Sequence, residues 1–288
     1  MTSIEQWWSE GQRESLALGG VKRDIFVRRT GAGAQMTLLH GFPSSSHDWA
    51  RVLPALAEQH ALLLFDFLGF GASEKPPDHD YSIHEQADLV QALWERHQIS
   101  STILLAHDYA VSVTQELLAR RAEGALPVEL AGVHLLNGGL YPDVYRPQPG
   151  QLALLDPVQG PQISANINQE LWSMALRPTF AEDFDASGDL ADIWRSMSHE
   201  DGHLIIHRLI RYMNDRSRHA ERWVDALEGT DVPLSFIWGM LDPISGAHMA
   251  TRIRERLSDA PLLALEDVSH WPSLEAPERL VGAILAGR

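Results

Sequence analysis

The chain of 288 residues contains no cysteine. Disulfide bonds, thiolate nucleophiles and metal sites built on cysteine sulfur are therefore excluded. Long apolar runs are also missing. The run at residues 61–65 is far shorter than the roughly 20 apolar residues that a membrane-spanning helix needs, and the first residues lack a basic stretch followed by an apolar one. We expect a cytoplasmic protein without a membrane span.

Basic residues are scarce. There are 23 of them against 39 acidic residues, which gives a formal net charge of -16. Binding to nucleic acid or to an anionic membrane depends on clustered Lys and Arg, so neither partner is expected. A small hydrophobic substrate and water are the expected partners, with no cofactor, and the chain is expected to be a monomer or homodimer. The 44% hydrophobic composition suits one large domain or one domain with an insertion.

Short apolar strands alternate with helical stretches, a pattern typical of an α/β fold with a largely parallel sheet. The strand pattern stops after residue 136 and resumes at residue 233, with helical and loop character between. We therefore predict a core at residues 1–138 and 229–288, interrupted by a helical lid at 139–228. The predicted strands are 24–29, 35–39, 61–66, 101–106, 129–136, 233–239 and 262–266, and the predicted core helices are 82–97, 109–121, 247–257 and 277–286.

A candidate nucleophile, Asp108, stands between the strand 101–106 and the helix 109–121. The small residues Ala106 and Ala110 flank it two places away, as a sharp strand-to-helix turn requires. Such a turn presents the Asp108 carboxylate at the C-terminal edge of the sheet, beside a helix N-terminus that stabilises an anion. An isolated Asp at this point is equally well interpreted as a simple helix cap.

Two further strand ends supply the partners that a nucleophile needs. Asp242 follows the strand 233–239 and His270 follows the strand 262–266, so the order is nucleophile, acid, histidine. After the strand 35–39 comes a glycine turn, and the N–H groups of Phe42 and Tyr109 are the expected oxyanion donors. The glycine and proline of that turn have a simpler interpretation, in which they only shape the chain.

These motifs resemble the α/β-hydrolase superfamily, and specifically its Asp-nucleophile branch of epoxide hydrolases and haloalkane dehalogenases. Two insertion segments, residues 135–147 and 211–227, look most similar to the mesoderm-specific transcript group. The resemblance implies an α/β-hydrolase fold over nearly the whole chain. The family-like motifs are HGFP at 40–43, DFLGFGASEKP at 66–76, AHDYA at 106–110, GMLDP at 239–243 and SHWPSLEAPE at 269–278.

An Asp nucleophile restricts the chemistry. Attack on an ester or amide carbonyl would form a reactive anhydride, whereas attack on saturated carbon gives a stable alkyl ester and expels a leaving group. We expect His270 to activate water for hydrolysis of that ester, while Asp242 fixes the histidine tautomer and stabilises the imidazolium.

The leaving group separates members of this branch. Family dehalogenases commonly hold the halide with a Trp after the nucleophile and an Asn or Trp nearby, but Tyr109 and Phe42 occupy those places here. Family epoxide hydrolases protonate the leaving alkoxide with lid tyrosines, and Tyr212 lies 30 residues before the acid (242 − 212), a similar placement. Tyr141 is a candidate second donor, although it and Tyr145 both lie near the start of the insertion. A single donor, or donation by a His or Trp, is the alternative. We predict an epoxide hydrolase that forms a vicinal diol.

Further side chains are expected to contact the substrate, and the list is His40, Pro43, His107, Tyr145, Trp172, Trp194 and Trp271. The main alternative is a haloalkane dehalogenase with the same triad, in which Trp172 and Trp194 would donate to the halide. The basic run of Arg216, Arg218 and Arg222 is typical of a solvated helix face.

Residues 199–203 (HEDGH) match the zinc-protease pattern H-E-x-x-H. That pattern needs both histidines on one uninterrupted helix, but Asp201 with Gly202 interrupts it. That pair instead looks like the start of a helix over 204–214. We expect no metal. A zinc-dependent hydrolase and a non-catalytic binding protein remain as alternatives of other classes, although a binding protein on this fold typically lacks a triad member.

Overall fold

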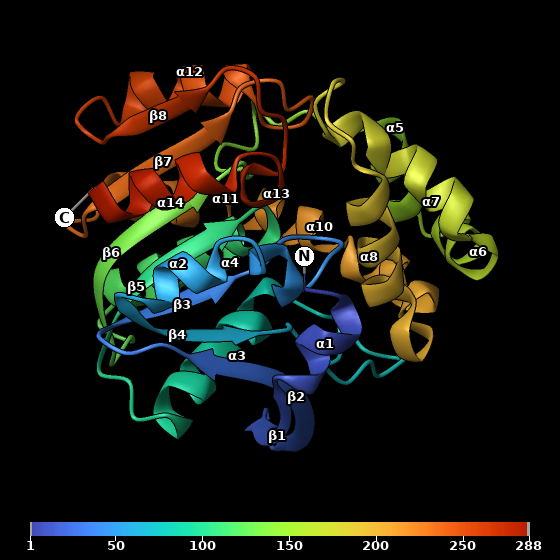
Figure 1. The fold of residues 1–288 in the computed structure, drawn as a ribbon, viewed down its shortest axis with the longest axis horizontal. Coiled ribbons are helices and arrows are strands. Elements are labelled where there is room, and N and C mark those ends of the chain that lie inside the picture. The colour runs from blue at the N-terminus through green and yellow to red at the C-terminus, as the bar shows by residue number, and fades with distance from the viewer. Residues whose placement is uncertain (1, 287–288) are drawn as a thin grey trace.

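A twisted sheet forms the centre of the molecule (Figure 1). The computed structural model describes residues 2–286, and within that range the sheet has eight strands in the order β1-β2-β4-β3-β5-β6-β7-β8. The strands β3 to β8 run parallel, while β2 pairs antiparallel with β1 and β4. The predicted α/β class is therefore confirmed. The strands are β1 Gln12–Leu18, β2 Val21–Thr30, β3 Ala34–Leu39, β4 His60–Phe65, β5 Ser101–His107, β6 Glu129–Leu136, β7 Leu234–Gly239 and β8 Leu262–Leu265.

Helices cover both faces of the sheet, as apolar parallel strands require. Helices α2 and α14 contact each other on one face, and α3 and α4 pack together on the other (Figure 1). Each face has its own cluster of buried apolar side chains. The helices of this core are α1 Ile4–Ser9, α2 Leu53–Ala57, α3 Ile83–Arg96, α4 Tyr109–Ala122, α12 Ala247–Arg256, α13 Pro272–Glu275 and α14 Pro277–Ala286.

The chain between β6 and β7 is helical and lies beyond the carboxyl ends of the parallel strands (Figure 1). Its last helix, α11, packs along α4 of the core. The lid boundaries at residues 139 and 228 stay a prediction. The helices are α5 Pro149–Leu155, α6 Gln159–Asn166, α7 Gln169–Leu176, α8 Ser187–Ser198, α9 Ile206–Leu209, α10 Tyr212–Arg218 and α11 Ala220–Glu228, with 3-10 turns at Arg177–Thr179 and His199–Ile205.

The zinc-like segment does not form one helix. Glu200 and Asp201 have φ values of 49° and 60°, which breaks the 3-10 turn between the two histidines. The helix expected over 204–214 is likewise divided between α9 and α10. Across residues 2–286, no group of three or more His, Cys, Asp or Glu side chains is arranged to hold a metal ion. Over the same range, no helix has the length and apolar character to cross a membrane.

Candidate active site

Asp108 is the single residue between β5 and α4. Its backbone has φ 47° and ψ -102°, a strained conformation for a residue with a side chain, which costs on the order of 1–3 kcal/mol. The turn is tightly packed: a Cβ added to Gly138 would lie 3.0 Å from the Asp108 carbonyl oxygen and 2.5 Å from Cγ2 of Val111. The predicted sharp turn therefore exists and places the carboxyl group at the carboxyl edge of the sheet.

The Asp108 carboxyl group is almost fully buried, with 4% of the residue exposed. Burial raises the pKa of Asp108, against the opposing effects of His270, Arg216 and the Phe42 N–H. That N–H donates to Oδ2 of Asp108 at 3.1 Å. Tyr109 begins α4, so its N–H belongs to the first turn, where helical N–H groups lack an intrahelical acceptor. The Phe42 N–H thus contacts the carboxyl group of Asp108, and the role of the Tyr109 N–H as the second oxyanion donor stays a prediction.

Asp242 lies in a turn after β7 and accepts hydrogen bonds from several donors. Nδ1 of His270 lies 2.8 Å from its Oδ2, and the same oxygen accepts from Ser245 Oγ at 2.7 Å and from Asn137 Nδ2 at 3.0 Å. The Ile244 N–H donates to Oδ1 at 2.8 Å. Burial alone would raise the pKa of Asp242, but His270 and these donors outweigh it and lower the pKa well below its usual range. Asp242 is therefore a fixed negative charge.

Asn137 was not expected from the sequence. It follows β6 directly and also accepts a hydrogen bond from the Gly239 N–H at 2.7 Å, so it ties two strand ends together. Its place immediately after a strand was the signal that could have identified it.

His270 is buried between two carboxylates. Burial lowers its pKa, but the charge and hydrogen bond of Asp242, with a contribution from Asp108, raise the pKa to about 9. At neutral pH the resting site therefore contains an imidazolium. Its pKa depends on the charge of the candidate nucleophile.

Tyr212 on α10 is fully buried, with its ring centre 5.0 Å from that of Tyr109 and 5.8 Å from that of Phe42. Burial raises the pKa of Tyr212, and the negative charge of Asp108 raises it further. Tyr145 shows the same two effects on its pKa, opposed by Arg216. Both phenols therefore lie close enough to Asp108 to respond to its charge.

Tyr141 has a different location from the one expected for a second proton donor. Its ring lies under the guanidinium of Arg252 from α12, at 5.8 Å, and its pKa is raised by burial and by the neighbouring Glu228. The Tyr145 N–H donates to the Tyr141 carbonyl, which closes a turn that sends the two rings to different neighbours. Tyr145, expected only to contact substrate, is the tyrosine beside Tyr212.

Arg216 is the clearest departure from the expected solvated face. It is 2% exposed, its Nε donates to Ser112 Oγ at 3.0 Å, and its guanidinium lies 4.7 Å from the Tyr145 ring centre and 4.9 Å from that of Tyr212. Tyr212 and Arg216 are one turn apart on α10 and share its buried side. Only Arg218, with 72% of its side chain exposed, behaves as the charge pattern predicts.

Two of the residues expected to contact substrate, His40 and His107, make hydrogen bonds that hold the backbone of the site. His40 donates from Nδ1 to the Gly41 carbonyl at 2.8 Å and accepts from the Phe67 N–H at 3.0 Å. His107 donates from Nε2 to the His270 carbonyl at 2.7 Å, and burial, with a contribution from His270, lowers the pKa of His107 to about 3. Pro43, also expected at the substrate, is buried after Phe42.

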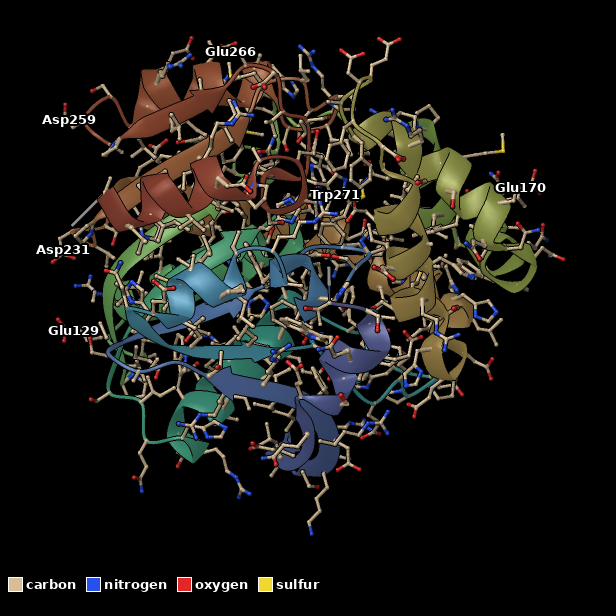
Figure 2. The ribbon with its side chains drawn as sticks, in the orientation of Figure 1. Glu129, Glu170, Asp231, Asp259, Glu266 and Trp271 are labelled. Atoms are coloured by element: carbon tan, nitrogen blue, oxygen red, sulfur yellow. The ribbon has the colours of Figure 1, made fainter. Side chains whose placement is uncertain are left out.

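The tryptophans have different surroundings. Trp271 lies where the core meets the lid helices (Figure 2); it donates to Thr179 Oγ1 at 2.8 Å, and its ring centre is 5.1 Å from that of His270. Trp172 is buried in the apolar cluster, and its Nε1 has no hydrogen-bond partner among residues 2–286. Trp194 is half-buried on α8 against the ring of His203.

The chain is similar in sequence to known proteins. The chain is 36% identical to the putative hydrolase LipZ of Mycobacterium tuberculosis over 286 residues, 99% of this chain and 97% of that protein. It is 38% identical to the human mesoderm-specific transcript homolog protein over 261 residues, 87% of this chain and 77% of that protein.

A solved structure of haloalkane dehalogenase DbeA from Bradyrhizobium elkani superposes with a TM-score of 0.77 at 20% identity, covering 96% of this chain and 97% of that one. The dehalogenase likeness shows a shared fold. Residues 38–283 match the alpha/beta hydrolase family, so the chain belongs to that family and has Asp-nucleophile relatives, as the sequence motifs predicted.

Proposed function

We propose that the chain hydrolyses an epoxide to a vicinal diol through an alkyl ester on Asp108. The observation that supports this most is the pair of phenols, Tyr145 and Tyr212. Both rings lie at the Arg216 guanidinium, and the Tyr212 ring packs against Phe42 and Tyr109, which adjoin Asp108. Two hydroxyl donors at that point, one buried and one half-buried, suit a leaving alkoxide, which needs a proton. Halide needs N–H donors instead, and Phe42 and Tyr109 provide neither indole nor amide side chains.

The first step would break one ring bond. The free oxygen of the Asp108 carboxylate attacks a ring carbon, the carbon–oxygen bond breaks, and the alkoxide takes a proton from Tyr212 or Tyr145. A neutral donor is needed at this moment, and burial keeps both phenols protonated by raising their pKa. The product of this step is a hydroxyalkyl ester and a tyrosinate.

Ester formation would also allow His270 to lose its proton and act as a base. The ester carries no negative charge, so one of the groups that raises the pKa of His270 disappears. The imidazolium can then return a proton to the tyrosinate and become neutral. Consumption of the nucleophile would therefore generate the base for the second step.

Neutral His270 then takes a proton from water as the water oxygen attacks the ester carbonyl of Asp108. The N–H of Phe42 already donates to Oδ2 of this group, and with the N–H of Tyr109 it would hold the resulting oxyanion. Collapse breaks the bond to the diol oxygen, which takes the remaining proton of the attacking water. The diol then leaves, the Asp108 carboxylate is regenerated and His270 stays protonated. The balance is one epoxide and one water consumed for each diol.

A single-turnover experiment tests the proposal. His270→Gln would be mixed with styrene oxide or with 1-bromobutane, and the intact mass and the peptide containing residue 108 would be measured. We expect an adduct on Asp108 with the epoxide, and none when Asp108→Ala is added to the same variant. An adduct formed only with the bromide would assign the chain to the dehalogenase alternative.

A further inference from the structure

We propose, on the basis of the epoxide chemistry above, that the substrate carries a carboxylate and that Arg216 binds this carboxylate next to Asp108. The substrate class would be a small epoxy acid, which water converts to a dihydroxy acid. The expected hydrophobic substrate would then need a negative charge close to the reacting carbon.

The first argument is the incomplete hydrogen bonding of a buried cation. Nη1 and Nη2 of Arg216 have no hydrogen-bond partner in the described chain, although the residue is only 2% exposed. A buried charged donor without a partner is destabilising. A ligand that accepts from both nitrogens would remove this cost.

The second argument is the shape of the free part of the guanidinium. Nε is already used by Ser112, and the rings of Tyr145 and Tyr212 lie near the group at 4.7 and 4.9 Å. The edge formed by Nη1 and Nη2 is what remains for a ligand. Such an edge matches a carboxylate through two parallel hydrogen bonds, which a spherical halide cannot use.

Gly139 makes room for this edge. A Cβ at that position would lie 2.2 Å from Nη1 of Arg216 and 2.9 Å from Cδ2 of Tyr145. The Arg216 side chain therefore depends on a glycine in the loop after β6, on the same side of the molecule as the Asp108 turn.

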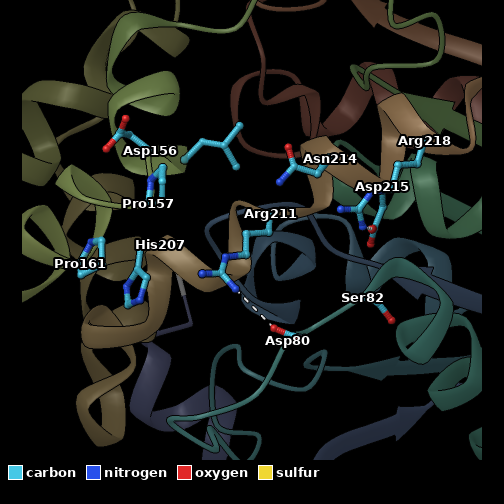
Figure 3. A pocket seen from close by; sticks show the side chains of 11 residues that line it. Asp80, Ser82, Asp156, Pro157, Pro161, His207, Arg211, Asn214, Asp215 and Arg218 are labelled. Atoms are coloured by element: carbon cyan, nitrogen blue, oxygen red, sulfur yellow. Dashed lines mark hydrogen bonds and ion pairs between the residues drawn. The ribbon is translucent and has the colours of Figure 1, made fainter.

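The nearby acidic residues are engaged elsewhere. Asp215 accepts from the Ile83 N–H at 3.0 Å, and Glu116 accepts from Arg120 at 2.8 Å and from Trp223 at 2.8 Å. Figure 3 shows the other side of α10, where Asp215 helps to line a hollow of about 490 Å³. Asp108 needs a free oxygen for attack, so none of these carboxylates takes the place of a ligand.

The formal charges of the site permit an anionic substrate. Asp108 and Asp242 are negative, while the His270 imidazolium and Arg216 are positive, so the four charges cancel. Without Arg216 the site would be negative and would repel a carboxylate from the nucleophile. The positive charge of the guanidinium therefore offsets the repulsion between an anionic substrate and the anionic nucleophile.

Equilibrium binding tests the subsite without any turnover. Cyclopropanecarboxylate is an unreactive analogue of the three-membered epoxy acid, and cyclopropanecarboxamide is its neutral counterpart. Titration calorimetry on the full chain should show that the acid binds at least about tenfold more tightly than the amide, as expected for a charged hydrogen-bonded pair. Arg216→Met should abolish this preference and Arg216→Lys should keep part of it.

Arg218→Met is the matched control, because it removes the same charge from the same helix at an exposed position, and its preference should equal that of the parent. Circular dichroism and the melting temperature would establish that each variant is folded. Equal affinities for acid and amide in the parent would overturn the proposal, as would an unchanged preference in folded Arg216→Met. If bromide competed for the site as strongly as the carboxylate does, that result would also overturn the proposal, in favour of a halide site.

Turnover separates this inference from the proposed function. For the parent, kcat/KM should be higher for glycidate than for glycidamide, and Arg216→Met should reduce the ratio by about tenfold or more. If neither compound alkylates Asp108 in His270→Gln while the acid analogue still binds through Arg216, the epoxide function fails and the anion subsite stands. If both compounds react with no preference for the acid, the subsite fails and the function stands.

Discussion

The charged groups of the site are paired to different degrees in its core half and its lid half. The core half contains Asp108, Asp242 and His270, and the lid half contains Tyr145, Tyr212 and Arg216. In the core half, Asp242 accepts from four donors, and the Phe42 N–H donates to Asp108. In the lid half, both terminal nitrogens of Arg216 lack partners among residues 2–286. A completed hydrogen-bond network is rigid before substrate arrives, whereas unpaired buried donors are completed by what binds. The comparison suggests a fixed reaction apparatus in the core and a recognition surface on the lid.

The largest effect is expected from breaking the core half. Asp242→Asn should lower kcat by about 10⁴-fold, because the neutral amide no longer stabilises the imidazolium or fixes its tautomer. It should also reduce the free energy of unfolding by about 3–5 kcal/mol, since a buried charged partner is lost. Steady-state kinetics and urea unfolding measure the two effects. A variant with parental kcat would remove Asp242 from the reaction.

The lid half should be broken next by Tyr212→Phe and Tyr145→Phe. Each variant should slow ring opening by about 10²-fold, because a general acid typically contributes about 10²–10⁴-fold, and the double variant should be slower than either. Ester hydrolysis should change little, since His270 and the oxyanion donors are intact. Stopped-flow measurement of the two steps separates them, and equal slowing of both would contradict the division of roles.

Stability should depend on pH through His270. Its folded pKa of about 9 is above the unfolded value near 6.5, so the folded state binds the proton more tightly. The resulting stabilisation is fully present below pH 6.5 and is lost as pH rises through 9, with a total of at most about 3 kcal/mol. Urea unfolding between pH 6 and pH 10 should show this loss in the parent and not in His270→Gln. If the free energy of unfolding changed equally with pH in the parent and in His270→Gln, the Asp242–His270 pair would not be coupled to folding in this way.

The smallest effect is expected for Tyr141→Phe, which sharpens the boundary of the lid half. Tyr141 contacts Arg252 rather than the tyrosine pair, so kcat/KM should stay within about twofold of the parent, as for substitutions away from a functional feature. A loss as large as that of Tyr145→Phe would restore Tyr141 as a donor.

The core half was the part that the sequence could predict. Asp108, Asp242 and His270 each follow a strand of a parallel sheet, and such strand ends meet at one edge because of local rules that a sequence displays. The strand β1 was missed, because charged residues dilute its apolar alternation, but Gly19 and Gly20, at positive φ, turn it back onto β2.

The lid half could not be predicted in the same way. The choice between Tyr141 and Tyr145 depends on a turn that brings one ring to α12 and the other to α10. Arg216 lies in a sequence of alternating charge that resembles a solvated face, and only the packing of α10 against the core shows that it is buried. Tertiary contacts rather than local pattern decide these positions.

The hydrogen bond from the Phe42 N–H distinguishes the two oxygens of Asp108, so that they exchange with water differently. Under the proposed mechanism, Oδ2 remains on this donor, and the other oxygen leaves with each product and is replaced from water. In ¹⁸O-labelled water the first diol formed by each molecule should therefore be unlabelled at the transferred oxygen. Every later diol should contain the label, and one atom of ¹⁸O should remain on Asp108. The label on the Asp108 carboxylate would therefore record the preceding turnover, and mass spectrometry of product and protein can measure it.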